Sequence, residues 1–150
     1  MSLELNINAA IKTAMLAKQE AELRALRAIK AAILIAKTAE GASAEISEAD
    51  EVKLLQKLAK QRKDSLEIFR TQNREDLAKK EEEELVVIDR YLPKQMDESE
   101  IRAAIAAIIS ETGASSPADM GKVMGAATKQ LAGKADGKIV SGIVKELLAK

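Results

Sequence analysis

The chain contains no cysteine and no histidine. The absence of cysteine excludes disulfides, thiolate zinc sites and a nucleophilic thiol. The absence of histidine removes Ser-His-Asp catalysis, the usual general base near neutral pH and the commonest metal ligand. Carboxylates, lysines, hydroxyl groups and the single tyrosine, Tyr91, are what remains for chemistry. We therefore expect no catalytic centre of its own, no bound metal and no cofactor.

Aromatic residues are almost missing as well, with one Phe, one Tyr and no Trp. Single-stranded nucleic acids are commonly held by stacking bases on aromatic rings, so this mode of binding is disfavoured. The formal net charge is zero, from 24 basic and 24 acidic residues, so no overall field attracts polyanions. A nucleic-acid partner would have to be folded RNA, recognised by shape and by phosphate contacts at a local basic patch, weakly and with strong salt dependence.

Long apolar runs are also missing. The longest, such as 103–109, are too short to span a bilayer, and the N-terminus has no basic stretch followed by an apolar core. We therefore expect a cytoplasmic protein without a membrane partner.

The abundant residues are Ala, Leu, Ile, Glu and Lys, which favour helices over strands. In the first part of the chain, apolar residues recur at helical spacing, and Ser47 with Asp50 has the form of a capping box. Gly41 is expected to end the second helix and to begin a loop. The run 85–88 resembles a strand but continues from 81–84 without a turn residue, so we assign it to a helix. The expected helices cover about 6–18, 21–39, 47–70 and 74–91, with the weakest boundary at 18–20.

Pro93 disfavours helical geometry at the residue before it and lacks an amide donor, so the joint between two subdomains is placed at 93–96. The predicted fold is all-α, with an N-terminal bundle of about four helices in residues 1–95 and a C-terminal three-helix bundle in residues 96–150.

Three helices are predicted after the joint from their caps and apolar stripes. Asp97 and Glu100 form a capping box, and Gly113 ends the helix that they begin. The string 116–119 combines an N-cap Ser, a Pro at the first helical position and an Asp against the helix dipole. The third helix begins at Asp136, after a turn at 133–137.

Four strings in these positions match one family pattern: Gln61-Arg62-Lys63-Asp64-Ser65, Tyr91-Leu92-Pro93, Ala118-Asp119-Met120-Gly121-Lys122-Val123-Met124 and Gly133-Lys134-Ala135-Asp136-Gly137. On these strings the chain resembles the GatB/YqeY family throughout its length. The strings 119–124 and 133–137 are the most specific of the four.

The resemblance implies a free-standing relative of the C-terminal tail of GatB, a component of the glutamine-dependent aspartyl/glutamyl-tRNA amidotransferase. That tail is linked to tRNA binding, whereas the ammonia-releasing and kinase-transamidase centres lie elsewhere in the enzyme. We therefore expect a tRNA-binding accessory protein in aminoacyl-tRNA metabolism, with an amidotransferase or an aminoacyl-tRNA synthetase as its protein partner.

Lysines and glycines of the C-terminal half are the candidate RNA contacts. Residues 113–150 hold six lysines and three acids, so this end is locally basic. Two glycines four residues apart in one helix should each cost about 1 kcal/mol relative to Ala, which indicates close approach by a neighbouring helix or, less favoured, by RNA. The turn at 133–137 lacks the spacing of a phosphate-binding loop and is more simply a helix-helix connection. The candidate RNA-binding residues are Lys122, Lys129, Lys134, Lys138, Gly121 and Gly125.

Charged residues of the N-terminal half are expected to stabilise the fold or to lie on solvated surfaces. Arg62 falls on an apolar stripe, which predicts a buried ion pair with an acid of the next helix. The acidic run 81–84 and the lysines 53, 57 and 60 are interpreted as solvated helix faces.

Two other functional hypotheses remain open at this point. The chain could be a helical adaptor that binds another protein through its second to fourth helices, without RNA. The least favoured hypothesis is an enzyme that performs amide transfer with carboxylates and lysines alone, since no nucleophile-base pair is identifiable.

Overall fold

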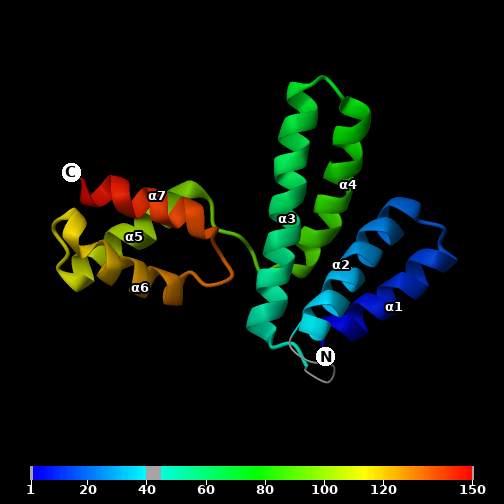
Figure 1. The fold of residues 1–150 in the computed structure, drawn as a ribbon, viewed down its shortest axis with the longest axis horizontal. Coiled ribbons are helices and arrows are strands. Elements are labelled where there is room, and N and C mark those ends of the chain that lie inside the picture. The colour runs from blue at the N-terminus through cyan, green and yellow to red at the C-terminus, as the bar shows by residue number, and fades with distance from the viewer. Residues whose placement is uncertain (1, 40–44, 150) are drawn as a thin grey trace. The chain divides into compact units, whose positions relative to one another are not determined.

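Every regular element is a helix in the part of the chain that the structure describes, residues 2–39 and 45–149 of a computed structural model (Figure 1). The prediction of an all-α fold is confirmed. The contacts between residues divide the chain into two units, Met1–Pro93 and Lys94–Lys150. Each unit has its own hydrophobic core. None of the described helices is both long enough and apolar enough to cross a bilayer.

The first unit consists of two helical hairpins (Figure 1). Helices α1 (Leu3–Leu16) and α2 (Glu20–Ala39) form the first, and α3 (Glu48–Thr71) and α4 (Glu75–Tyr91) form the second. The hairpins join mainly where α2 packs on α4. Branched aliphatic side chains and small alanines fill the space between the four helices, and the largest fully buried ones are Ile7, Leu26, Ile29, Leu55 and Ile88.

Local capping determines where these helices begin. The first helix starts three residues earlier than predicted, because the Ser2 hydroxyl accepts a hydrogen bond from the Leu5 amide at 3.3 Å and caps it. Ser47 caps α3 as predicted, accepting from the Asp50 amide at 3.1 Å. The break after the first helix is confirmed, since Lys18 has a φ of 56°. Gly41, the expected end of the second helix, lies outside the described residues.

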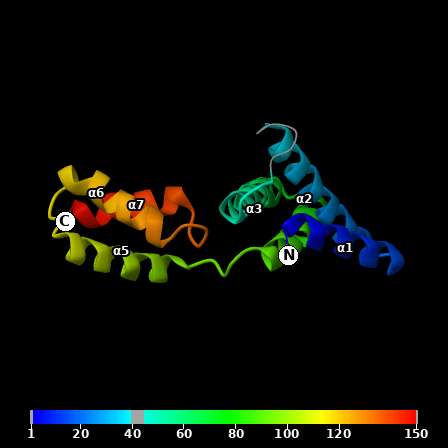
Figure 2. The same cartoon turned by 90° about the horizontal axis from the view of Figure 1, so that it is seen from below.

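The second unit is a bundle of three helices (Figure 2). They are α5 (Glu98–Thr112), α6 (Met120–Gln130) and α7 (Gly137–Leu148). The capping box of α5 is present, with the Asp97 carboxylate accepting from the Glu100 amide at 2.8 Å. Gly113 ends α5 in the left-handed conformation, with a φ of 68°. The residues Pro117–Asp119 form the single 3-10 turn η1 rather than the first turn of α6.

The segment after Pro93 is attached to the second unit by hydrogen bonds. Leu92 has an extended conformation, as expected before proline, and α4 ends at Tyr91. The Gln95 side-chain amide donates to the Gly133 carbonyl at 2.8 Å. The Met96 backbone amide donates to the Lys134 carbonyl, also at 2.8 Å. These two bonds fix the start of the second unit against the connection between α6 and α7.

Candidate nucleic-acid interface

The outer face of α6 carries four of the six candidate residues. Val123 and Ala127 of this helix are fully buried, whereas Gly121, Lys122, Gly125 and Lys129 are all exposed. At about 100° per residue, these four positions fall within an arc of about 100° on the side opposite the buried pair. The structure therefore gathers two lysines and two glycines on one solvent-facing strip of a single helix.

The two glycines of α6 have no neighbour that explains them. A Cβ atom built on Gly121 or on Gly125 would have no heavy atom within 4 Å outside its own helix backbone. The favoured explanation from sequence, close packing of a neighbouring helix, is therefore wrong for the helices of the second unit. The cost of glycine inside a helix is not balanced by any contact within the described residues.

The other two candidates, Lys134 and Lys138, lie at the connection between α6 and α7. Gly133 has a φ of 76°, which lets the chain turn there, and both lysines are exposed. The Asp136 carboxylate caps α7 by accepting from the Lys138 amide at 3.0 Å. The prediction of a structural helix-helix turn at 133–137 is confirmed, and the lysine side chains remain available on its surface.

Sequence reasoning missed two residues of the same kind on α7. Gly142 and Lys145 are exposed, and a Cβ on Gly142 would also meet nothing within 4 Å. With Lys138 they lie within an arc of about 60° at 100° per residue. The signal was present in the spacing, because both α6 and α7 carry two lysines seven residues apart with a glycine between them. Two lysines at this spacing are separated by about 10.5 Å along the helix axis.

The acids of the second unit are mostly engaged elsewhere. The Asp119 carboxylate accepts from the backbone amides of Ser115 at 3.0 Å and Ser116 at 3.3 Å. These bonds lower the pKa of Asp119, with a smaller contribution from the nearby charge of Lys122. Arg102 binds two further acids, Glu146 at 2.8 Å and Glu98 at 3.1 Å.

Few carboxylates of the second unit are therefore left to pair with its surface lysines. In an ion pair, a carboxylate oxygen lies within 4.0 Å of the lysine nitrogen. Within the described residues, no carboxylate oxygen lies that close to four of these lysines, which are Lys129, Lys134, Lys138 and Lys145. A phosphate group approaching these side chains would displace only water and counterions.

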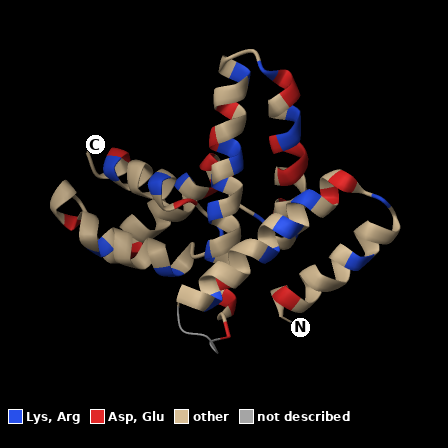
Figure 3. Cartoon of the chain, turned by 45° about the vertical axis from the view of Figure 1, so that its right-hand side comes forward, with Lys and Arg blue, Asp and Glu red and all other residues tan. Residues whose placement is uncertain are grey.

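The charged cluster of the first unit has a structural role instead. Glu84 lies between two guanidinium groups, with its Oε1 3.8 Å from Arg62 Nη2 and 3.7 Å from Arg24 Nε. The predicted ion pair of Arg62 with an acid of the next helix is confirmed. The interpretation of 81–84 as a solvated face is wrong for Glu84, which is 9% exposed. Figure 3 shows basic and acidic positions along both α3 and α4 of this unit. Burial and, secondarily, the charge of Glu84 raise the pKa of Glu81.

Tyr91, the single tyrosine, is half-buried against the core of the first unit. Burial raises the pKa of its hydroxyl, and the charge of Glu22 raises it further. No group of three or more acidic side chains within the described residues is arranged to hold a metal ion.

Two curated proteins are similar to parts of this chain. One, from Lachancea thermotolerans, is named "Altered inheritance of mitochondria protein 41, mitochondrial" and is 32% identical over 114 residues, which are 75% of this chain. The protein of the same name from Meyerozyma guilliermondii is 39% identical over 85 residues, or 55% of this chain. The matches span 60% and 42% of the length of these relatives. The expectation of a cytoplasmic protein stays a prediction, since both relatives are named as mitochondrial.

The family comparison covers nearly the whole chain. The family described as Yqey-like protein matches residues 4–148, which include both units and all four strings that carried the resemblance. The chain therefore belongs to the YqeY-like protein family.

Proposed function

We propose that this protein is an accessory factor that binds folded RNA, tRNA by family resemblance, through the outer faces of α6 and α7. The observation that carries the proposal is that Gly125 and Gly142 lie on the exposed faces of α6 and α7 with open space around them. Because glycine has no side chain, another backbone can approach the helix closely at these two positions. The lysines before and after each glycine supply positive charge for contacts with phosphate groups.

The physical character of the surface favours folded RNA over single strands. The described residues of the second unit include neither Phe, Tyr nor Trp, so bases cannot stack there on aromatic rings. The wide minor groove of an RNA helix presents phosphates and 2′-hydroxyl groups to a smooth protein surface. Binding of this kind depends on counterion release, and its affinity falls steeply with salt.

The family gives the biological setting of the proposal. The resemblance to the GatB tail of the amidotransferase supports a role beside an enzyme that modifies aminoacyl-tRNA, with the chemistry performed by that enzyme. The proposed setting is cytoplasmic, as the sequence predicts, although the matched relatives, which are longer proteins, are named as mitochondrial.

A titration of the full chain against unfractionated tRNA at 50 and 200 mM salt tests the proposal. The wild-type protein should bind more weakly at the higher salt. Replacing Lys122, Lys129, Lys134 and Lys138 together by Glu should reduce affinity at least tenfold at the lower salt. The quadruple variant should also show a shallower dependence of affinity on salt, because fewer phosphates are neutralised.

A matched control makes the same change of charge in the first unit, at Lys12, Lys53, Lys57 and Lys80. Circular dichroism checks that both quadruple variants fold. If both lose affinity equally, binding follows total charge and the proposed surface is wrong. Unchanged binding by the variant of the second unit would contradict the proposal directly.

The alternative function, a helical adaptor for another protein, has one observation in its favour. Large apolar side chains are exposed on the first unit, including Leu16 at 87% and Ile35 at 70%. Retrieval of a partner from cell extract after nuclease treatment, together with no measurable tRNA affinity, would favour the adaptor.

A further inference from the structure

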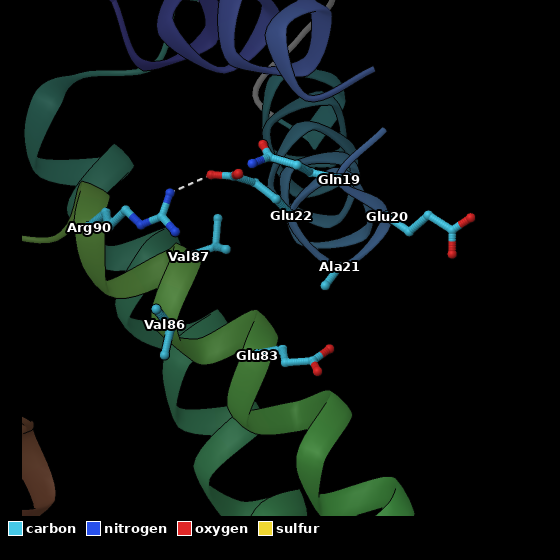
Figure 4. A pocket seen from close by; sticks show the side chains of 8 residues that line it. All are labelled: Gln19, Glu20, Ala21, Glu22, Glu83, Val86, Val87 and Arg90. Atoms are coloured by element: carbon cyan, nitrogen blue, oxygen red, sulfur yellow. Dashed lines mark hydrogen bonds and ion pairs between the residues drawn. The ribbon is translucent and has the colours of Figure 1, made fainter. Parts of the chain in front are cut away.

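A groove on the first unit lies between the start of α2 and the second half of α4 (Figure 4). Its volume is about 390 Å³. The residues that line it are Gln19, Glu20, Ala21, Glu22, Glu83, Val86, Val87 and Arg90. None of these residues belongs to the proposed RNA-binding surface of the second unit.

The floor of the groove is apolar. Ala21 and Val87 are largely covered, but Val86 is 55% exposed. Val86 points away from the core because the buried positions of α4 around it are Glu84, Val87 and Ile88. An aliphatic side chain entering the groove would remove this exposed surface from water, which is the usual source of affinity in a helix-binding groove.

The rim of the groove is acidic. Three carboxylates line it, those of Glu20, Glu22 and Glu83, against one guanidinium group, that of Arg90. Glu22 pairs with Arg90, and Glu83 lies 3.2 Å from Arg24, so the groove walls are held in place. The Glu20 side chain is directed away from this network toward solvent (Figure 4). Because Glu22 and Glu83 are each paired with an arginine, Glu20 is the acid among the lining residues that is left to attract a cation and repel a phosphate group.

We propose that the groove binds a basic helical segment of another protein, which inserts an aliphatic side chain over Val86 and places a Lys or Arg beside Glu20. The charge of the rim complements such a segment and disfavours RNA at this site. The proposal is independent of RNA binding by the second unit. It gives the first unit a binding surface of its own, made of residues that the RNA-binding proposal does not use.

The test uses the full-length chain labelled with nitrogen-15 and a synthetic 18-residue helical peptide. The peptide carries two leucines four residues apart, flanked by Lys and Arg, in an Ala and Gln background. Backbone amide shifts should change at Ala21, Val86 and Val87 as the peptide is added. A peptide of the same sequence with Glu replacing every Lys and Arg should bind at least tenfold more weakly.

A pair of matched variants distinguishes binding in the groove from non-specific hydrophobic binding elsewhere on the surface. Val86→Gln should weaken peptide binding about tenfold, whereas Ile68→Gln should change it less than twofold, because Ile68 is equally exposed, at 54%, but does not line the groove. Glu20→Gln should weaken binding about threefold at low salt and less at high salt.

Four outcomes would overturn the proposal. They are the absence of groove shifts at 1 mM peptide, equal binding of the acidic peptide, equal effects of the two matched variants, or the same shifts on addition of a short RNA duplex. Self-association of the wild-type chain that Val86→Gln abolishes would assign the groove to a second copy of the protein instead.

Discussion

The Glu84 carboxylate lies beside two guanidinium groups of the first unit, those of Arg62 and Arg24. Its side chain is 12% exposed, and that of Arg62 is 18% exposed. The Arg62 Nε atom is buried and has no hydrogen-bond partner within the described residues. Arg62 therefore depends on Glu84 for compensation of its charge, since desolvating an unpaired guanidinium is costly.

Replacing Glu84 by Leu should lower the free energy of unfolding by about 2 to 4 kcal/mol, because the largely buried Arg62 then loses the carboxylate with which it pairs. Urea unfolding followed by circular dichroism measures the change. The double variant Glu84→Leu with Arg62→Met should recover most of the loss, since the two residues interact. Glu83→Leu is the control and should cost less than about 1 kcal/mol, because its pair with Arg24 is more exposed. A double variant less stable than Glu84→Leu would contradict the role of the pair.

The neighbouring Glu81 makes the opposite contribution at neutral pH. Burial and the charge of Glu84 raise its pKa in the folded state, so ionised Glu81 disfavours folding above that pKa. This unfavourable contribution is relieved as pH falls through the raised pKa, and it is absent below the pKa of the unfolded chain. Glu81→Gln should therefore raise the melting temperature at pH 7 relative to the wild type and give no gain near pH 3. An equal gain at both pH values would show that the carboxylate charge is not the cause.

Arg62 and Glu84 show what the sequence could and could not predict at single positions. The ion pair of Arg62 is predictable because a charged residue on an apolar stripe requires a partner of opposite charge when it is buried. Glu84 was missed, although it lies four residues before buried Ile88 and seven after Leu77. A run of four glutamates hides this spacing, since composition alone indicates a solvated surface.

Helix α6 and helix α7 each carry a glycine that the fold does not need. Replacing Gly125 or Gly142 by Ala should raise the free energy of unfolding by about 0.5 to 1 kcal/mol each, because the new methyl group meets open space and the helix gains propensity. The same variants should bind tRNA more weakly if a backbone approaches these positions. Urea unfolding and the tRNA titration are measured on the same samples. Increased stability with unchanged tRNA affinity would remove the glycines from the proposed interface.

Substitution of Gly113 is the control for the substitutions of Gly125 and Gly142. A Cβ there would also meet nothing within 4 Å, but the φ of 68° is unfavourable for any residue with a side chain. Gly113→Ala should therefore destabilise the protein by about 1 kcal/mol.

Helix boundaries and glycine environments differ in how far sequence can predict them. The caps at Ser47, Asp97 and Gly113 were predicted because a cap depends on residues three or four positions away. The sequence does not predict the surroundings of Gly121 and Gly125, because these depend on which side of α6 faces the neighbouring helices. Their spacing of four residues is compatible with either a packed or an open face.

For the whole chain, the division into two units determines which surfaces can act independently. The proposed RNA contacts all lie in Lys94–Lys150, and the acidic groove lies in Met1–Pro93. The sequence placed the joint near Pro93 from local geometry alone. The prediction placed Met96 in the second bundle but Gln95 in the first, because the partner of Gln95, the Gly133 carbonyl, lies 38 residues further along the chain.

The independence of the two units is itself testable, because the boundary predicts the behaviour of fragments. Fragment 94–150 should unfold cooperatively in urea, since it retains a complete core and the bonds of Gln95 and Met96 to the α6–α7 connection. Fragment 97–150 lacks both bonds and the packing of Met96, so its unfolding free energy should be lower by about 1 to 3 kcal/mol. Gln95→Ala within the longer fragment should remove about 1 kcal/mol of this difference. Circular dichroism during urea titration measures all three, and equal stability of the two fragments would show that the segment after Pro93 is only a linker.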